Sequence, residues 1–303
     1  MYPILTFDSL TAHLQQTGRT FKLAVVCGSD DSTLQAVMKA VMLGYAEAFF
    51  VGDCHAIQSQ QVVKTYNGNM VHYIEANTPE DAAQKAIKMA HNGQADVIVK
   101  GLIHTDTLLH AVLNKEWGIL PNGNVLTHIA MCEMPNYHKL LFMSDAAVIP
   151  YPTDQQRAQQ VAYLAQLLHA FGIAEPKVAL IHCAETVNAK FPHTIGYAAI
   201  CQQAKSGTWG RLLVDGPLDL RSACDPQALK IKGINSCLQG DADALILPDI
   251  ESANALYKAL PLFAQARVAG TLQGTIVPVV LPSRGDDADA KYHSIALATM
   301  GCQ

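Results

Sequence analysis

The sequence has no pair of cysteines at the CxxC spacing used by many metal and redox sites, although it contains eight cysteines. Several of these cysteines lie in apolar, strand-like runs, where cysteine behaves as a small hydrophobic residue. The pattern predicts a reducing, cytoplasmic compartment rather than a disulfide framework. No His/Cys cluster has zinc-site spacing, and His182-Cys183 is interpreted as the end of a strand. We therefore expect no metal site.

Features of membrane and nucleic-acid-binding proteins are also missing. No uncharged apolar run approaches the ~20 residues that span a bilayer. Residues 1–8 have neither a basic region nor a long apolar stretch, so we do not expect a signal peptide. The net charge of −5 gives no reason to expect a nucleic-acid or membrane partner. With 50% apolar and 16% charged residues, the 303-residue chain predicts a large core in one or two domains.

Three short motifs of common enzyme classes are absent. The sequence contains no GxGxxG, no GxxxxGK[ST] and no GxSxG. Their absence weakens nicotinamide-binding, nucleoside-triphosphatase and serine-hydrolase interpretations. There is also no repeat at a fixed period and no heptad pattern, so a solenoid or a coiled coil is not expected.

What the sequence does contain is a regular alternation of strand and helix patterns. Helices are bounded by clear signals, such as Thr78-Pro79-Glu80-Asp81 at one start and Gly44 at one end. This alternation predicts a mostly parallel sheet with helices on both faces. In the first part of the chain, we predict strands at 21–27, 47–51, 71–74 and 96–100, with helices at 32–43, 56–65, 78–91 and 105–114.

The pattern changes near residues 118–150. A loop with Pro121 and Gly123 precedes two closely spaced strands, 125–132 and 140–142, which predict an antiparallel hairpin and the start of a second domain. Alternation then resumes. We predict helices at 153–171, 195–204, 251–263 and after 287, with strands at 178–181, 212–214, 244–247, 268–272 and 276–281.

The most informative segment is residues 279–287. An apolar strand pattern stops at Ser283, Arg284, Gly285, Asp286 and Asp287, and a helical pattern follows at once. A strand that delivers such groups to a helix N-terminus suits an anion, and the arginine adds bidentate chemistry for phosphate. The alternative is ordinary turn and cap chemistry.

Other predicted strands also end in polar residues, and open α/β sheets bind ligands at these ends. Each group taken alone is ordinary turn chemistry, but together they predict a cleft lined with hydroxyls, one arginine and several carboxylates. These groups are Gly28-Ser29-Asp30, Lys100-Gly101 with His104-Thr105, Ser144-Asp145, Asp215-Gly216-Pro217, Pro248-Asp249 with Glu251 and Asn254, and Ser283-Arg284.

Longer motifs agree in order and spacing with one enzyme family over about two hundred residues, a span much more specific than any short pattern. The first hundred residues fit more loosely. The chain resembles the phosphate acetyltransferase/butyryltransferase family, and more specifically its butyryltransferase branch. The matching runs are residues 104–118 (HTDTLLHAVLNKEWG), 141–147 (LFMSDAA), 214–218 (VDGPL), 240–243 (GDAD), 248–258 (PDIESANALYK), 283–284 (SR) and 294–298 (SIALA).

This resemblance implies reversible acyl transfer between coenzyme A and inorganic phosphate. It implies a fold like that of the isocitrate and isopropylmalate dehydrogenases, with two α/β domains flanking a cleft. The domains would be 1–122 plus 270–303, and 123–269. The hairpin would build the contact of a homodimer or higher homo-oligomer. Coenzyme A would be a substrate, with no tightly bound cofactor.

The resemblance also assigns site residues. Arg284 and Ser283 would bind phosphate and stabilise charge in the transition state, and Asp286 is nominated as the base for the thiol. Asp286 could equally cap the following helix. Two departures from the family pattern are His110, where an arginine is usual, and Ala290, where the acetyltransferase branch has an aspartate. Thr105, His104, His110, Ser144 and Asn254 complete the expected phosphate and substrate contacts.

Two rival interpretations remain. A metal- and nicotinamide-dependent dehydrogenase on the same fold could use Asp215, Asp241, Asp243 and Asp249 as Mg²⁺ ligands. A non-catalytic acyl-CoA- or phosphate-binding relative is suggested by His110 and Ala290. The acyl-chain length stays open, although the run 114–118 favours butyryl or branched short chains.

Overall fold

The structure is a computed structural model that describes residues 2–283 and 285–302. The chain divides into two compact units, which we treat separately. The terminal unit comprises Phe7–Leu126 and Val268–Gln303. The central unit comprises Thr127–Arg267 and the first residues of the chain up to Thr6.

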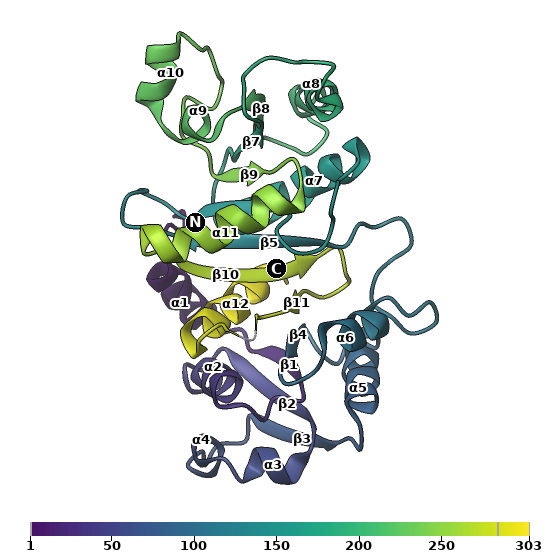
Figure 1. The fold of residues 1–303 in the computed structure, drawn as a ribbon. Coiled ribbons are helices and arrows are strands. Elements are labelled where there is room, and N and C mark those ends of the chain that lie inside the picture. Colours follow the sequence, from purple (N-terminus) through teal and green to yellow (C-terminus); the bar gives the residue numbers. More distant parts are fainter. Residues whose placement is uncertain (1, 284, 303) are drawn as a thin grey trace. The chain divides into compact units, whose positions relative to one another are not determined.

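The terminal unit is built on a mostly parallel sheet in the order β3-β2-β1-β4-β11-β10 (Figure 1). Among the described residues of this unit, β10–β11 is the one antiparallel pair. The strands are β1 (Phe21–Val26), β2 (Ala46–Gly52), β3 (Val71–Glu75), β4 (Val97–Lys100), β10 (Arg267–Gln273) and β11 (Val279–Val280). The helices are α1 (Phe7–Gln16), α2 (Asp31–Met42), α3 (Cys54–Gln58), α4 (Gln61–Lys64), α5 (Pro79–His91), α6 (Thr105–Val112) and α12 (Ala288–Met300).

Burial explains the apolar sequences of the central strands and of the last helix in this unit. The central strands β1 and β4 are almost entirely buried, as expected for parallel strands covered by helices on both faces. Helix α12 is buried all round from Lys291 to Met300, so this stretch is a core helix with no solvent-exposed face. It packs against α2 in this core (Figure 1).

The central unit has the strand order β5-β6-β9-β7-β8. β5 and β6 form the predicted antiparallel hairpin, and the other pairs are parallel. Its strands are β5 (Thr127–Glu133), β6 (Leu141–Ser144), β7 (Lys177–Ile181), β8 (Leu213–Leu218) and β9 (Ala244–Ile246). Its helices are α7 (Asp154–Ala170), α8 (Pro192–Lys205), α9 (Leu220–Cys224), α10 (Pro226–Lys232) and α11 (Ile250–Ala264).

These observations confirm the predicted α/β class with mostly parallel strands, while several details differ. The helix expected at 56–65 is two short helices, α3 and α4, because the chain turns at Ser59 and Gln60 begins a second helix. The strand expected at 276–281 contracts to Val279–Val280. Helices α1, α9 and α10 were not predicted. Within the described residues, no helix combines the length and the apolarity needed to cross a bilayer.

Candidate functional site

Three adjacent strands of the terminal unit end at the same edge of its sheet. β1 and β4 run parallel with Val26 opposite Lys100, and β11 runs parallel to β4 with Val280 opposite Val99. The chain leaves these strands to begin α2, α6 and α12. Three helix N-termini therefore lie at the carboxyl edge of the sheet, where backbone N–H groups and helix dipoles favour an anion.

Close packing holds the loops after β1 and β4 together. Gly101 N donates to Val26 O over 2.8 Å, and Leu102 N donates to Cys27 O over 2.8 Å. A Cβ atom at Gly101 would overlap the backbone of Cys27 and Gly28, so only glycine fits there. This contact fixes the start of the loop that leads to α6.

The N-terminus of α6 is open to a ligand. His104 occupies the N-cap position, but its side chain makes no capping hydrogen bond to the first turn. Its neighbour Thr105 is exposed, with its hydroxyl in the same turn. Amide groups that lack an intrahelical acceptor at a helix N-terminus bind anions readily. The phosphate contacts that the resemblance assigns to Thr105 and His104 stay predictions.

Ser283 and Asp286 form a tight turn before α12. Asp286 N donates to Ser283 O over 3.1 Å, while Ser283 N donates to Asp286 Oδ2 over 2.8 Å. The cap of α12 is Asp287, whose Oδ1 accepts from Ala290 N over 2.8 Å. The alternative role for Asp286 as the helix cap is thus wrong, because the next residue occupies that position. Arg284 lies outside the described residues.

A buried lysine lies beneath this edge, and sequence reasoning did not find it. Lys291 of α12 is 7% exposed, and its Nζ donates to Asp30 Oδ1, Ser32 Oγ and Thr33 Oγ1 over 2.8–2.9 Å. Burial raises the pKa of Asp30, but hydrogen bonds from Lys291, Thr33 and Ser32 outweigh it and lower this pKa to about 2. The network ties the start of α2 to α12. Little in the sequence signals it, because Lys291 is one of several polar residues in this helical run, with Asp289, His293 and Ser294.

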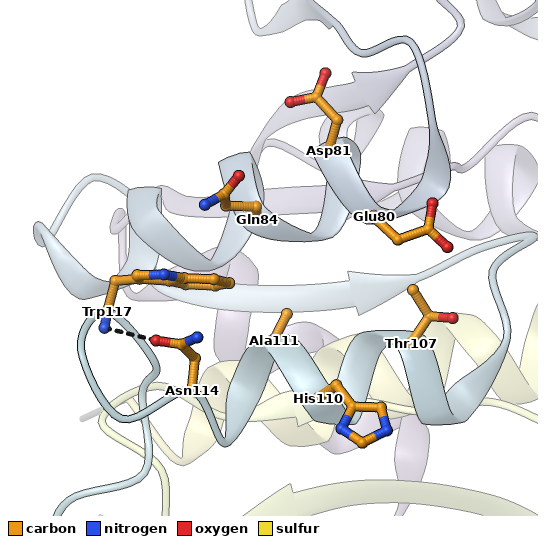
Figure 2. Close-up of a pocket in the computed structure, with 8 residues that line it drawn as sticks. All are labelled: Glu80, Asp81, Gln84, Thr107, His110, Ala111, Asn114 and Trp117. Carbon is orange, nitrogen blue, oxygen red and sulfur yellow. Dashed lines mark hydrogen bonds between the residues drawn. The ribbon is translucent and has the colours of Figure 1, made fainter.

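A groove of about 590 Å³ lies between α5 and α6 in the same unit (Figure 2). His110 contributes to its lining, and Figure 2 shows the His110 ring projecting from the side of α6 turned away from α5. His110 and Thr105 are thus on one helix, but His110 is more than one turn further from the carboxyl edge of the sheet. The groove is lined by Glu80, Asp81, Gln84, Thr107, His110, Ala111, Asn114 and Trp117.

Two predicted site residues belong to the central unit. The side chain of Ser144 is fully buried, with its Oγ 3.1 Å from Thr127 Oγ1. Asn254 is exposed, and its Nδ2 donates to Ala146 O over 3.0 Å. Both residues support the loop after β6, where Asp145 Oδ1 accepts from the amides of Ala147 and Val148. Their roles toward a substrate stay predictions.

The carboxylates considered as Mg²⁺ ligands have protein partners. Asp241 pairs with Lys139 and Lys177, and Asp243 pairs with Lys139. Asp249 caps α11 by accepting from Ser252 N over 2.8 Å, and Asp215 accepts from Gly216 N. In the described part of the chain, no group of three or more His, Cys, Asp or Glu side chains is arranged to hold a metal ion. The structure therefore gives the dehydrogenase interpretation no ligand set.

The fold is shared by two kinds of enzyme, dehydrogenases and phosphotransacylases. A solved 4-hydroxythreonine-4-phosphate dehydrogenase from Klebsiella pneumoniae shares it with a TM-score of 0.54 at 10% identity, over 94% of this chain and 100% of that one. A branched-chain phosphotransacylase from Enterococcus faecalis V583 is much more similar. Its TM-score is 0.81 at 31% identity, and the match covers 94% of this chain and 99% of that one.

Sequence comparison then identifies the family. A phosphate butyryltransferase from Clostridium beijerinckii is 36% identical over 296 residues, covering 97% of each chain. The family model described as phosphate acetyl/butaryl transferase matches residues 56–299. The chain belongs to this family, and the resemblance drawn from its motifs is confirmed. The family match includes the α5–α6 groove and the N-termini of α6 and α12, whereas α2 precedes the matched residues.

Proposed function

We propose that this protein transfers an acyl group reversibly between coenzyme A and inorganic phosphate, with butyryl or branched short chains as its substrates. The observation that carries this proposal is the convergence of α2, α6 and α12 at one sheet edge, in a chain of this family. A phosphate oxygen attacks the thioester carbonyl, the C–S bond breaks, and acyl phosphate and coenzyme A result. No covalent enzyme intermediate is required.

The phosphate would bind at the N-terminus of α6. The free amides of its first turn and the Thr105 hydroxyl offer donors, with His104 beside them. Ser283 is exposed at the neighbouring strand end, and its hydroxyl is available to the same phosphate. The family pattern adds Arg284, whose guanidinium suits bidentate contact with phosphate and with the developing oxyanion.

Asp286 would handle the proton of the coenzyme A thiol. A free thiol has a pKa near ~8.5, so a carboxylate that accepts its proton makes the thiolate available for the reverse reaction. In the forward direction, the same carboxyl returns the proton to the departing sulfur. Asp286 Oδ2 is used by Ser283 N, which holds the carboxylate in place, while no described group bonds Oδ1.

Asp286→Asn is expected to lower kcat about 100-fold, the usual scale for removing a positioned base. The amide oxygen can still accept from Ser283 N, so the turn and the melting temperature should be preserved. The neighbouring Asp287→Asn is the matched control, since asparagine caps a helix as well as aspartate does. Equal activity in the two variants, measured by CoA release, would remove Asp286 from the mechanism.

The function itself is tested by phosphate-dependent release of coenzyme A from acetyl-, butyryl- and isobutyryl-CoA, followed with a thiol reagent. We expect release that is fastest with four-carbon chains and absent without phosphate. Folded protein that releases no coenzyme A from any of the three would support the non-catalytic relative instead. His110 and Ala290 would then be the first positions to examine.

We also infer a homodimer built by the central unit. Helix α11 has only Ala253 buried along its fifteen residues, although its composition is strongly apolar, and Leu262 and Phe263 are 73% and 81% exposed. A second copy of the β5–β6 and α11 face would cover these side chains. Sedimentation equilibrium that finds only the 32.6 kDa monomer would contradict this.

The domain limits 1–122 plus 270–303 and 123–269 stay predictions.

We place this activity in the cytoplasm, because all eight cysteines are free and acyl-CoA is an intracellular substrate. We expect the enzyme to need no tightly bound cofactor. Dialysis against a chelator should therefore leave phosphate-dependent CoA release unchanged, and a loss of activity restored by a metal ion would contradict this expectation.

A further inference from the structure

A cavity of about 580 Å³ lies within the central unit, at the carboxyl ends of its parallel strands. β7 pairs in parallel with both β8 and β9, so these three strands end at the same edge of the sheet (Figure 1). The described residues that line the cavity all belong to this unit, and His182 and Cys183 directly follow β7. Open α/β sheets bind ligands at this edge, which makes the cavity a candidate for chemistry of its own.

Cys183 has surroundings unlike those of the other cysteines. Its side chain is exposed, and its Sγ lies 3.6 Å from Nε2 of the buried His182. By contrast, burial raises the pKa of seven other thiols, those of Cys27, Cys54, Cys132, Cys201, Cys224, Cys237 and Cys302. An accessible thiol beside an imidazole is the arrangement that makes cysteine nucleophilic, so Cys183 is the thiol best placed to react.

A second histidine holds the first in place. His193 Nε2 lies 3.2 Å from His182 Nδ1, and the backbone N–H of His182 donates to Leu218 O over 2.8 Å. Burial lowers the pKa of His193, and the positive charge of Arg157 lowers it further, so its neutral form is favoured. Neutral His193 accepts the Nδ1 proton of His182, which leaves Nε2 of His182 to accept the thiol proton. A nucleophile, a base and a group that orients the base are therefore aligned.

The rest of the lining suits a short acyl chain. The two carboxylates that line the cavity are already engaged, because Asp219 pairs with Lys232 over 2.6 Å and Asp249 caps α11. An acyl group attached to Cys183 would therefore enter a mostly apolar space rather than solvent. The apolar walls are formed by Ile181, Phe191, Leu220 and Leu247.

We propose that Cys183 is an acylation site, at which acyl phosphate leaves its acyl group as a thioester. The proposal rests on the acyl transfer proposed above, which supplies the acyl phosphate. His182 Nε2 takes the thiol proton, Sγ attacks the carbonyl carbon, and a C–S bond forms. The C–O bond to phosphate breaks, inorganic phosphate leaves with the electron pair, and His182 passes the proton to it. The thioester is a modification of the protein, since the transfer itself needs no covalent intermediate.

Chemically prepared butyryl phosphate tests this site without any turnover. The treated chain is digested, and thioesters are located by mass spectrometry with and without cleavage by neutral hydroxylamine. Cys237 is the internal control, because it is also exposed but its Sγ contacts Val214 O rather than an imidazole. We expect Cys183 to be acylated about 10-fold faster than Cys237, since a neighbouring base raises the thiolate fraction. Equal rates at the two cysteines would overturn the proposal.

The length of the acyl chain tests the role of the cavity walls. Butyryl phosphate should acylate Cys183 about 10-fold faster than acetyl phosphate, because two more methylene groups are buried against apolar side chains. The acylation of Cys237 should show no such preference. A Cys183 rate that does not depend on chain length would contradict the assignment of this cavity as the acyl pocket.

Variants of the two histidines test the proton path. His182→Phe keeps a ring against Phe191 and should lower the acylation rate of Cys183 about 100-fold, the scale of losing a general base. His193→Gln keeps an acceptor for the His182 proton and should retain most of the rate. His193→Phe keeps only the ring beside Tyr197 and should lose the rate.

The opposite order of the two His193 variants would mean that His193 acts through packing alone. An unchanged rate in His182→Phe, with folding confirmed by circular dichroism, would remove His182 as the base. In every variant the acylation of Cys237 should stay at its wild-type rate, because this thiol has no contact with either histidine.

A failure of the proposed function has a different signature. In that case wild-type protein releases no coenzyme A from any acyl-CoA, yet chemically prepared butyryl phosphate still decides whether Cys183 forms a thioester. Normal phosphate-dependent CoA release without a thioester at Cys183 would overturn the acylation site alone.

Discussion

Arg284→Ala is expected to lower kcat for phosphate-dependent CoA release by about 100- to 1000-fold, the range seen when one preorganised donor to a developing oxyanion is lost. Ser283 and Asp286 form a turn anchored by two mutual hydrogen bonds, between the buried strand β11 and α12. Alanine removes the charge and the bidentate donors that phosphate requires. The loss should therefore appear in KM for phosphate as well as in kcat.

Two variants make this result specific. Arg284→Lys keeps the charge but not the planar fork, so it should recover only part of the activity. Arg211→Ala is the matched control, because Arg211 is an exposed arginine of the central unit that pairs with Glu175. It should retain wild-type rates. Full activity in Arg284→Ala, with folding confirmed by circular dichroism, would remove Arg284 from the mechanism.

The architecture was predictable because local and tertiary signals agree. The central strands β1 and β4 of the terminal unit are buried, and helices of this unit start at strong N-caps such as Thr78 and Asp30. The hairpin was predictable from two strands separated by a short loop with Pro135 and Asn136. A fold can be predicted from sequence when local signals and tertiary packing agree in this way.

Other elements depend on contacts that no local pattern encodes. Helix α1 is amphipathic, but its buried residues Phe7, Leu10 and Leu14 find partners far along the chain, including α12. The strand at 276–281 shortens because only Val279 and Val280 pair with β4. Pairing partners decide strand length, and periodicity does not reveal them.

The site was predictable in part for the same reason. Polar residues at strand ends located Thr105, Ser283 and Asp286, because parallel strands end at one edge. The distinction between Asp286 and Asp287 as helix cap needed coordinates, since adjacent aspartates look alike in sequence. The α5–α6 groove could not be predicted from the sequence either, because its lining comes from two separate helices and a loop.

Lys291→Met is expected to lower the free energy of unfolding at pH 7 by about 3 kcal/mol, the cost of breaking a buried charge pair from one side. Lys291 is 7% exposed and bonds Asp30, Ser32 and Thr33 at once. Methionine fills the same volume but leaves the Asp30 carboxylate without its cation. Lys39→Met is the control, because the Lys39–Asp289 pair also joins α2 to α12 but is about half exposed and should contribute under ~1 kcal/mol.

The pH dependence of unfolding should separate this pair from simple packing. Asp30 has a pKa of about 2 in the folded protein against an ordinary value of 3.8, so the folded state binds its proton less readily than the unfolded state. The stability it contributes is complete above about pH 4 and is lost as the pH falls toward about 2. Urea titrations across this window should show that loss in wild type and a smaller one in Lys291→Met. If the free energy of unfolding falls by the same amount with pH in the two proteins, Lys291 acts through its hydrocarbon stem. Only a charge interaction makes the stability difference between wild type and Lys291→Met depend on the protonation of Asp30.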